Sequence, residues 1–131
     1  MAGYSGTPLE KKLGVKDGQV VYLDKAPAGF ELDAPTTTRL PKTTAITLTF
    51  HSTAATLTKR MPELIARTET AGMIWVCWPK KAAQKLGHVS DLDDNLVRGI
   101  GLDAGMVDVK ICAVDDVWSG MKFVRRLVDR T

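Results

Sequence analysis

The sequence predicts a three-layer α/β sandwich whose sheet is mostly parallel and ends in an antiparallel hairpin at the C-terminus. Two observations carry this prediction. Short apolar segments rich in β-formers alternate along the chain with helical segments, and such alternation favours a parallel sheet with right-handed crossovers. The last two apolar segments are joined by too few residues for a helix, so they must run antiparallel. With 131 residues, of which 44% are hydrophobic, the chain suffices for one compact domain, expected over residues 1–131.

The first elements are bounded by helix and turn residues. Thr7 precedes a proline and then a leucine and a glutamate, a capping-box pattern that predicts a helix over Pro8–Leu13, ending at Gly14. The apolar run Gln19–Asp24 has the length of a strand buried on both faces.

The next region is rich in proline and threonine. Residues 27–33 are expected to form one or two helical turns. The β-branched run Thr36–Leu40 lies between two prolines and predicts an edge strand. Ala45–Phe50 alternates apolar residues with threonine, which is a strand pattern.

A helix is predicted after this strand, with Ser52 as its cap and Gly72 as its end. Pro62 should kink or divide it. One face carries apolar residues at helical spacing: Leu57, Met61, Leu64 and Ile65.

The strand Met73–Trp78 follows, and alternation places Trp75 and Cys77 on one side of the sheet and Val76 and Trp78 on the other. A further helix should begin at Ser90–Asp93, bury Leu92, Leu96 and Ile100, and be weakened at its end by Gly99 and Gly101. The hairpin strands are predicted over Val107–Val114 and Trp118–Val128.

Composition excludes several classes of protein. Eighteen Lys and Arg stand against 15 Asp and Glu, with a pI near 9.0, which is basic but far from the charge density of a dedicated nucleic-acid binder. No segment has the length of a membrane span or the apolar core of a signal peptide, so a cytoplasmic location is expected. Cys77 and Cys112 stand alone in apolar runs and are interpreted as reduced core residues, with neither a disulfide nor zinc.

The predicted topology resembles that of the Rossmann-like methyltransferases that use S-adenosylmethionine, in which a parallel sheet also ends in a hairpin. GVKDGQVVYLD, residues 14–24, looks like the approach to their first strand. That family carries two or three glycines in the following turn, where the backbone comes close to the cofactor. The turn Asp24–Phe30 has one glycine, so no cofactor is predicted.

A closer resemblance exists at the level of residues. GYSGTPLEKKLGVKDG (residues 3–18), WPKK (78–81) and VDVKICAVDDVWSGMKFVRR (107–126) are similar to a family of small bacterial proteins known as domain of unknown function number three thousand and fifty-two. The resemblance covers nearly the whole chain. It implies no particular activity.

Polar residues follow several predicted strands, and in open α/β sheets ligands bind at the carboxyl ends of the strands. Side chains from four strands are therefore expected to converge on one edge of the sheet, joined by a tryptophan of the hairpin. These ligand-binding candidates are Asp24, Lys25, His51, Ser52, Lys80, Lys81, Asp115, Asp116 and Trp118. The simpler interpretation is that strands end in polar loops because loops are solvated.

Familiar catalytic and metal-binding patterns are missing from the sequence. It contains no Ser-His-Asp order, phosphate-binding P-loop or HExxH motif. Asp115 and Asp116 are adjacent on an extended chain, so their side chains should point to opposite sides. His51 stands beside a helix cap, and His88 has no second ligand nearby, so no metal is predicted.

Basic residues form two groups that would attract an anion. The first comprises Lys80, Lys81 and Lys85, and the second Lys122, Arg125, Arg126 and Arg130. If the last strand lies beside the WVCWP strand, both groups belong to one side of the sheet, with Arg125 and Arg126 nearer the opposite edge. The alternative is an ordinary solvated surface. Nucleic acid is a less favoured ligand, because RNA-stacking modules expose aromatic residues on a sheet face.

Two functions from different classes remain open. The leading hypothesis is a non-catalytic module that binds an acidic partner or a small anion at the carboxyl edge. The alternative is an enzyme with an unfamiliar site on that edge, using His51 or an aspartate as base; S-adenosylmethionine-dependent transfer is the less favoured form of it. The oligomeric state stays open, with a homodimer through a sheet edge as one option.

Overall fold

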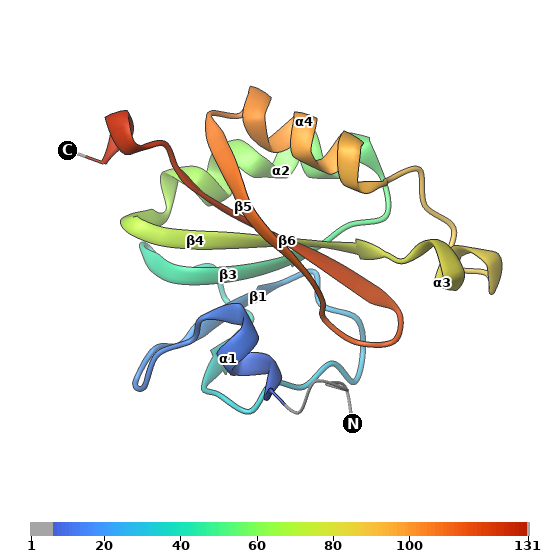
Figure 1. Cartoon of the computed structure of the whole chain (residues 1–131). Coiled ribbons are helices and arrows are strands. Elements are labelled where there is room, and N and C mark those ends of the chain that lie inside the picture. Colours follow the sequence, from blue (N-terminus) through green and yellow to red (C-terminus); the bar gives the residue numbers. More distant parts are fainter. Residues whose placement is uncertain (1–6, 131) are drawn as a thin grey trace.

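The computed structural model describes residues 7–130 and contains one sheet of six strands in the order β2-β1-β3-β4-β6-β5 (Figure 1). The strands are β1 (Val21–Asp24), β2 (Thr36–Thr37), β3 (Thr44–Phe50), β4 (Thr68–Pro79), β5 (Met106–Ala113) and β6 (Trp118–Arg125). The helices are α1 (Leu9–Leu13), α2 (Ala54–Ala66), α3 (Lys81–Lys85) and α4 (Asp94–Asp103), and η1 (Leu127–Asp129) is a short 3-10 turn.

The sheet has a parallel part and an antiparallel part. β2, β1, β3 and β4 run parallel to their neighbours, with Leu23 paired to Leu48 and Leu48 to Trp75. β6 is inserted between β4 and β5 and runs antiparallel to both. This confirms the predicted fold class and shows that the last strand lies beside the WVCWP strand, a position that the sequence left open.

Helices cover both faces of the sheet. α2 and α4 lie on one face and α1 lies on the other, as Figure 1 shows. β4 contributes to two cores: Val76 and Trp78 pack under α2 and α4, whereas Trp75 and Cys77 pack on the α1 side. The predicted alternation of this strand is therefore confirmed, and it follows from the two-residue period of an extended chain.

The predicted helix starts need correction. α1 has Pro8, not Thr7, as its N-cap, with no side-chain cap bond from it, while Gly14 ends the helix in the left-handed conformation as predicted. α2 is capped by Thr53, not Ser52, and the Thr53 hydroxyl accepts a hydrogen bond from the Thr56 amide. Neighbouring residues of the same capping type cannot be distinguished by sequence alone.

Pro62 does not divide α2, which runs unbroken to Ala66. The proline is exposed, so the carbonyl that loses its helical partner lies on the solvent side of the helix. The prediction that Gly72 ends the helix was wrong. Gly72 lies within β4, at a register shift against β3, where a Cβ atom would come within 2.9 Å of the Ala45 carbonyl oxygen. Close backbone approach thus explains this glycine.

Five further predictions need correction. Leu96 is exposed and Val97 occupies the core position of α4 instead. Residues 27–33 form a turn and bends with no helix. β6 ends at Arg125, short of Val128. The edge strand predicted over Thr36–Leu40 exists only at Thr36–Thr37, and α3 forms in a segment that was expected to be a loop.

Gly101, which was expected only to weaken α4, is required by packing. A Cβ atom at this position would overlap the ring of Phe123 on β6. Within residues 7–130, no helix is both long enough and apolar enough to cross a bilayer.

Candidate functional site

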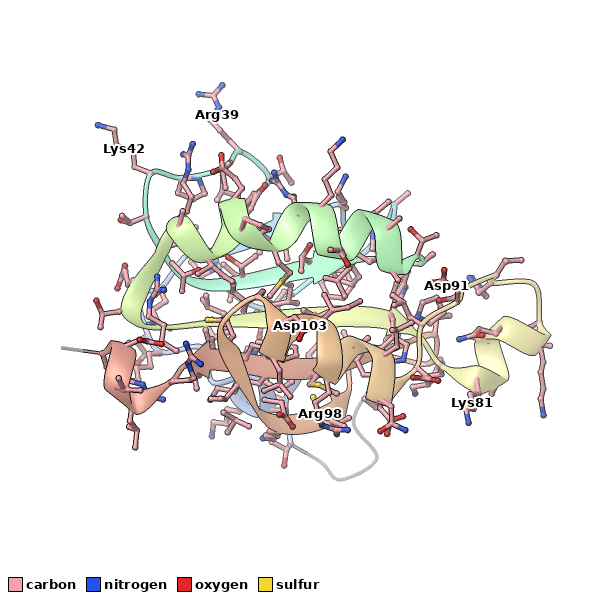
Figure 2. All side chains as sticks on the ribbon, turned by 90° about the horizontal axis from the view of Figure 1, so that it is seen from above. Arg39, Lys42, Lys81, Asp91, Arg98 and Asp103 are labelled. Atoms are coloured by element: carbon pink, nitrogen blue, oxygen red, sulfur yellow. The ribbon has the colours of Figure 1, made fainter. Side chains whose placement is uncertain are left out.

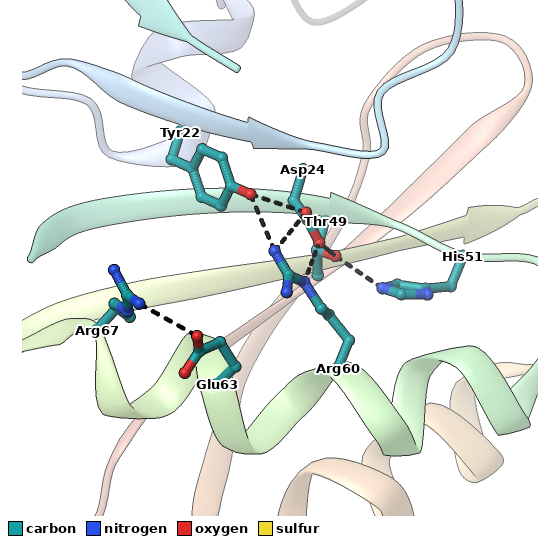
Figure 3. A network of polar contacts seen from close by, with 7 residues as sticks. All are labelled: Tyr22, Asp24, Thr49, His51, Arg60, Glu63 and Arg67. Carbon is teal, nitrogen blue, oxygen red and sulfur yellow. Dashed lines mark hydrogen bonds and ion pairs between the residues drawn. The ribbon is translucent and has the colours of Figure 1, made fainter. Parts of the chain in front are cut away.

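Two predicted site residues, Asp24 and His51, lie at the carboxyl ends of β1 and β3 and join one buried polar network (Figure 3). The Asp24 carboxylate accepts hydrogen bonds from Tyr22 Oη at 2.9 Å and from Thr49 Oγ1 at 2.7 Å. Arg60 of α2 donates two hydrogen bonds to the same carboxylate, from Nε to Oδ2 at 3.1 Å and from Nη2 to Oδ1 at 3.0 Å. Both carboxylate oxygens are therefore fully occupied by the chain itself.

The register of the sheet assembles this network. Tyr22 and Asp24 are two residues apart and so share a face of β1, and Thr49 is the partner of Asp24 across the β1–β3 ladder. The Arg60 side chain extends from α2 toward β1 and also donates to Tyr22 Oη at 3.0 Å. Sequence reasoning missed Tyr22, Thr49 and Arg60. The available signal was a polar side chain at every second position of two apolar strands.

The network keeps Asp24 charged. Burial by itself raises the pKa of the Asp24 carboxyl, but hydrogen bonds from Arg60, Thr49 and Tyr22, together with the charge of Arg60, outweigh it and lower the pKa below its ordinary 3.8. Burial and the neighbouring Asp24 raise the pKa of Tyr22. The group is thus a buried ion pair with a neutral phenol beside it.

His51 is held at both ring nitrogens. Nε2 lies 2.7 Å from Thr49 Oγ1, and Nδ1 lies 3.0 Å from Thr56 Oγ1. Because the Thr49 hydroxyl donates to Asp24, His51 Nε2–H must donate to Thr49, which leaves Nδ1 as the unprotonated nitrogen facing the Thr56 hydroxyl. Burial lowers the pKa of His51 to about 4, with Lys25 and Arg60 acting in the same direction and Asp24 against it. At neutral pH the ring is uncharged, and each ring nitrogen lies against a threonine hydroxyl.

Aromatic side chains fill the other face of this edge. The rings of Phe30 and Phe50 meet edge to face with centroids 5.0 Å apart, and Phe50 meets Trp118 in the same way at 5.2 Å. Phe30 belongs to the segment after β1, which packs on the α1-side core through further apolar residues. Above β1 and β3 the carboxyl edge is therefore closed on both faces.

The carboxyl end of β4 differs, because a hollow of about 230 Å³ opens there. Its lining joins the end of β4 and the start of α4 to strands β5 and β6: Trp78, Lys80, Lys81, Leu92, Asp93, Asp94, Ile111 and Ser119. Lys80 is fixed by its backbone, whose amide donates to the Val117 carbonyl at 2.8 Å. Within residues 7–130 neither Lys80 nor Lys81 forms an ion pair. Asp93 is engaged as the cap of α4, accepting from the Leu96 amide at 2.8 Å.

Other predicted site residues hold loops together. The Ser52 carbonyl accepts from Ser90 Oγ at 2.8 Å and from the Asp91 amide at 3.1 Å. The Asp115 carboxylate closes the hairpin turn by accepting from the amides of residues 117 and 118, each at 2.8 Å. Lys25 and Asp116 are exposed, and Lys25 has a positive φ of 58°.

The two basic groups lie at different ends of the sheet. Lys85 is exposed on α3 beyond the end of β4. Arg125, at the far end of β6, donates to the carbonyls of Ile65 and Thr68, each at 2.7 Å, and so fastens β6 to the α2–β4 junction. Arg126 pairs with Asp129 at 3.0 Å. The remaining members are Arg130, which donates to the Arg125 carbonyl, and Lys122, half-buried on β6.

A larger hollow of about 600 Å³ lies at the opposite, amino edge of the sheet. It is bordered by the segments before β1 and β3, including Val20, Arg39 and Pro41. Among the described residues, no three His, Cys, Asp or Glu side chains are grouped so as to hold a metal ion. Burial raises the pKa of the Cys77 thiol well above its ordinary range and also raises that of Cys112, so neither is an activated nucleophile.

Comparison with solved structures identifies the fold. The magnesium protoporphyrin IX methyltransferase ChlM of Synechocystis PCC 6803, with bound S-adenosylhomocysteine, superposes with a TM-score of 0.52 at 11% identity over 71% of this chain and 52% of that one. LepI, in complex with S-adenosylhomocysteine and a substrate analogue, gives a TM-score of 0.55 at 10% identity over 90% of this chain and 39% of that one. The fold is therefore that of the Rossmann-like methyltransferases, although the chain spans about half or less of their length.

No family model matches the sequence, and neither does any curated protein. The resemblance to the bacterial family of unknown function thus stays a prediction. The residues present do not fit S-adenosylmethionine at the edge where the fold would hold it. One glycine follows β1, the Phe30 ring packs there, and the hollow at β4 is smaller than the 300–1,000 Å³ typical of ligand pockets.

Proposed function

We propose that this chain is a binding module that receives an anionic group in the hollow beside Lys80 and Lys81. One contrast carries the proposal. The polar residues above β1 and β3 are satisfied by one another, whereas the two lysines at the end of β4 form no ion pair with any residue between 7 and 130. Unpaired ammonium groups at the edge of an α/β sheet are suited to a carboxylate or a phosphate.

The hollow favours a small charged group over a nucleotide. Its volume of about 230 Å³ falls below that of typical pockets for larger ligands. Trp78 and Leu92 provide apolar walls. Two carboxylates, Asp93 and Asp94, also line the hollow, and that of Asp93 accepts a hydrogen bond from the Leu96 amide. Two sources share this chemistry: a free small anion, and an acidic side chain on another protein.

The test is an NMR titration with inorganic phosphate, citrate and a glutamate-rich peptide, monitoring amide shifts. We expect saturable shifts around Lys80, Lys81 and Ser119 that disappear when Lys80→Glu and Lys81→Glu are combined. Lys59→Glu, an exposed lysine on α2, is the matched charge control and should leave binding unchanged. Binding of phosphate would indicate a small anion, and binding of the peptide alone would indicate a protein. Shifts that survive the double charge reversal would refute the proposal.

A second candidate is an enzyme that uses S-adenosylmethionine, and the likeness to structures that contain this cofactor or its product favours it. At about 10% identity that likeness is an argument from the fold alone. Binding of S-adenosylmethionine at the carboxyl edge above β1 would require the Phe30 ring to separate from Phe50 and the segment after β1 to move.

Thermal melts with S-adenosylhomocysteine separate the two candidates. A ligand at 100 times its dissociation constant stabilises a protein by about 2.7 kcal/mol, which shifts the melting temperature measurably. If the enzyme candidate holds, Phe30→Ala should enlarge that shift by clearing the edge. The absence of a shift at millimolar ligand in both proteins would end this candidate.

A further inference from the structure

Charges of both signs border the hollow at the carboxyl end of β4. Lys80 and Lys81 come from the cap and first residue of α3, whereas Asp93 and Asp94 come from the cap and first residue of α4. Figure 2 shows the Lys81 side chain beyond the end of β4, at the end of the molecule where α4 begins. An anion alone would therefore engage only the basic part of this lining.

The two signs of charge are held apart by different elements. Within residues 7–130, no ion pair joins either lysine to either aspartate. The Lys80 amide donates to the Val117 carbonyl at 2.8 Å, and the Asp93 carboxylate accepts from the Leu96 amide at 2.8 Å. Asp94 follows in the first turn of α4, and no described side chain forms an ion pair with it. A ligand with a positive and a negative group can bridge such charges.

The volume and the walls of the hollow suit a small aliphatic ligand. Its volume of about 230 Å³ corresponds to about eight water-sized groups at about 30 Å³ each, which is the size of an amino acid such as valine. The walls include the buried side chains of Trp78 and Leu92 and that of Ile111, which is 45% exposed. An aliphatic side chain placed against them would remove apolar surface from water, which favours binding.

We propose that this hollow receives a free aliphatic α-amino acid, with its carboxylate at Lys80 and Lys81, its ammonium group at Asp94 and its side chain against Trp78 and Ile111. This inference rests on the proposed function for the carboxylate, and it adds the ammonium contact, the aliphatic side chain and hence the class of ligand. An acidic side chain of another protein carries no ammonium group and would leave Asp94 unpaired, so the free amino acid is the better match.

The test is an NMR titration that follows amide shifts with L-valine, N-acetyl-L-valine and L-valinamide. Acetylation removes the ammonium charge of the ligand, and amidation removes its carboxylate. We expect valine to bind about fivefold more tightly than either derivative, the upper value for one ion pair at an exposed site. The largest shifts are expected at Lys80, Asp94 and Ser119.

Asp94→Asn should change the affinities for two of these ligands in opposite directions. Valine should bind more weakly, because its ammonium group loses its partner, and N-acetylvaline should bind more tightly, because a carboxylate that repels it is gone. Asp103→Asn, an exposed aspartate at the other end of α4, is the matched control and should change neither affinity. Because Asp94 is exposed, nearly unchanged thermal melts are expected, and Asp94→Ser provides a second variant.

The outcomes separate this inference from the proposed function. If valine and N-acetylvaline bind equally, Asp94→Asn changes neither, and Lys80→Glu with Lys81→Glu abolishes both, the amino-acid inference fails and the anion site stands. If valine still binds after the double charge reversal, and valinamide binds equally well, the aspartates act alone and both proposals fail. If neither the three valine ligands nor phosphate shifts these amides, the anion site fails and the inference fails with it.

Discussion

The carboxyl ends of β1 and β4 look alike in sequence but differ in the folded molecule. Each strand ends in charged residues, Asp24-Lys25 after β1 and Lys80-Lys81 after β4. Asp24 is 5% exposed and takes four hydrogen bonds from three side chains, whereas Lys80 and Lys81 border an open hollow with no ion pair among residues 7–130. A charged residue after a strand is therefore structural or available for binding according to what the neighbouring elements offer it.

The largest expected effect is the loss of Arg60. Arg60→Met leaves the Asp24 carboxylate buried without its cation, and breaking a buried ion pair costs about 3–5 kcal/mol. Because the Arg60 side chain is 26% exposed, solvent screening places the expected loss near the lower end, about 3 kcal/mol. Urea denaturation at pH 7 measures it. Arg39→Met, on an exposed arginine outside the network, should change stability by less than about 0.5 kcal/mol. If Arg60→Met lowered the free energy of unfolding by no more than Arg39→Met does, the polar network would not stabilise the fold.

The second largest effect is expected from acid, which should lower the free energy of unfolding through His51 at the closed edge above β1 and β3. The pKa of His51 is about 4 in the fold and 6.5 in its ordinary state, so the unfolded chain takes up a proton first as the pH falls. The contribution is fully present above pH 6.5 and is lost between pH 6.5 and 4, amounting to about 3 kcal/mol by pH 4. The lowered pKa of Asp24 acts in the same direction below 3.8.

Urea denaturation across this pH range, compared with His51→Asn, isolates the histidine. The variant should show a shallower fall of stability with pH, whatever its stability at pH 7. Equal slopes in the two proteins would contradict the burial of a neutral imidazole.

The start of α4 lines the open hollow, and Gly99 and Gly101 lie toward the other end of this helix. Substituting each glycine tests whether the packing of α4 at that end matters for stability. Gly101→Ala inserts a methyl group into the Phe123 ring and should cost about 2 kcal/mol by overpacking. Gly99→Ala meets nothing within 4 Å and should stabilise the helix by about 0.5–1 kcal/mol. Thermal denaturation of both variants gives the comparison, and the expectation fails if the two changes have the same sign.

The smallest effect is expected at the open end. Lys81→Ala removes an exposed side chain that has no ion-pair partner among the described residues, so stability should change by less than about 0.5 kcal/mol. Any binding of phosphate or of a glutamate peptide should nevertheless weaken. A destabilisation above 1 kcal/mol, measured by urea denaturation, would show that Lys81 has a structural role and would remove the contrast between the two ends.

Sequence reasoning located both ends of the contrast but not their difference. It placed Asp24, His51 and the lysine pair at one edge because carboxyl ends of parallel strands share an edge. It did not find Arg60, which is separated from Asp24 by 36 residues. No sequence pattern in α2 distinguishes Arg60 from an ordinary exposed cation. It also missed α3, since five residues of helix carry too little periodicity to be recognised.

The sequence by itself determined the class of fold, the alternation of β4 and the antiparallel hairpin. These depend on local patterns, namely strand period, segment length and the space between segments, which a chain carries without reference to its partners. Only the tertiary structure decided that Gly101 must be small, that Thr49 lies opposite Asp24 and that Phe30 closes the edge above β1. Each of these depends on register and packing between distant segments, and no local pattern encodes such contacts.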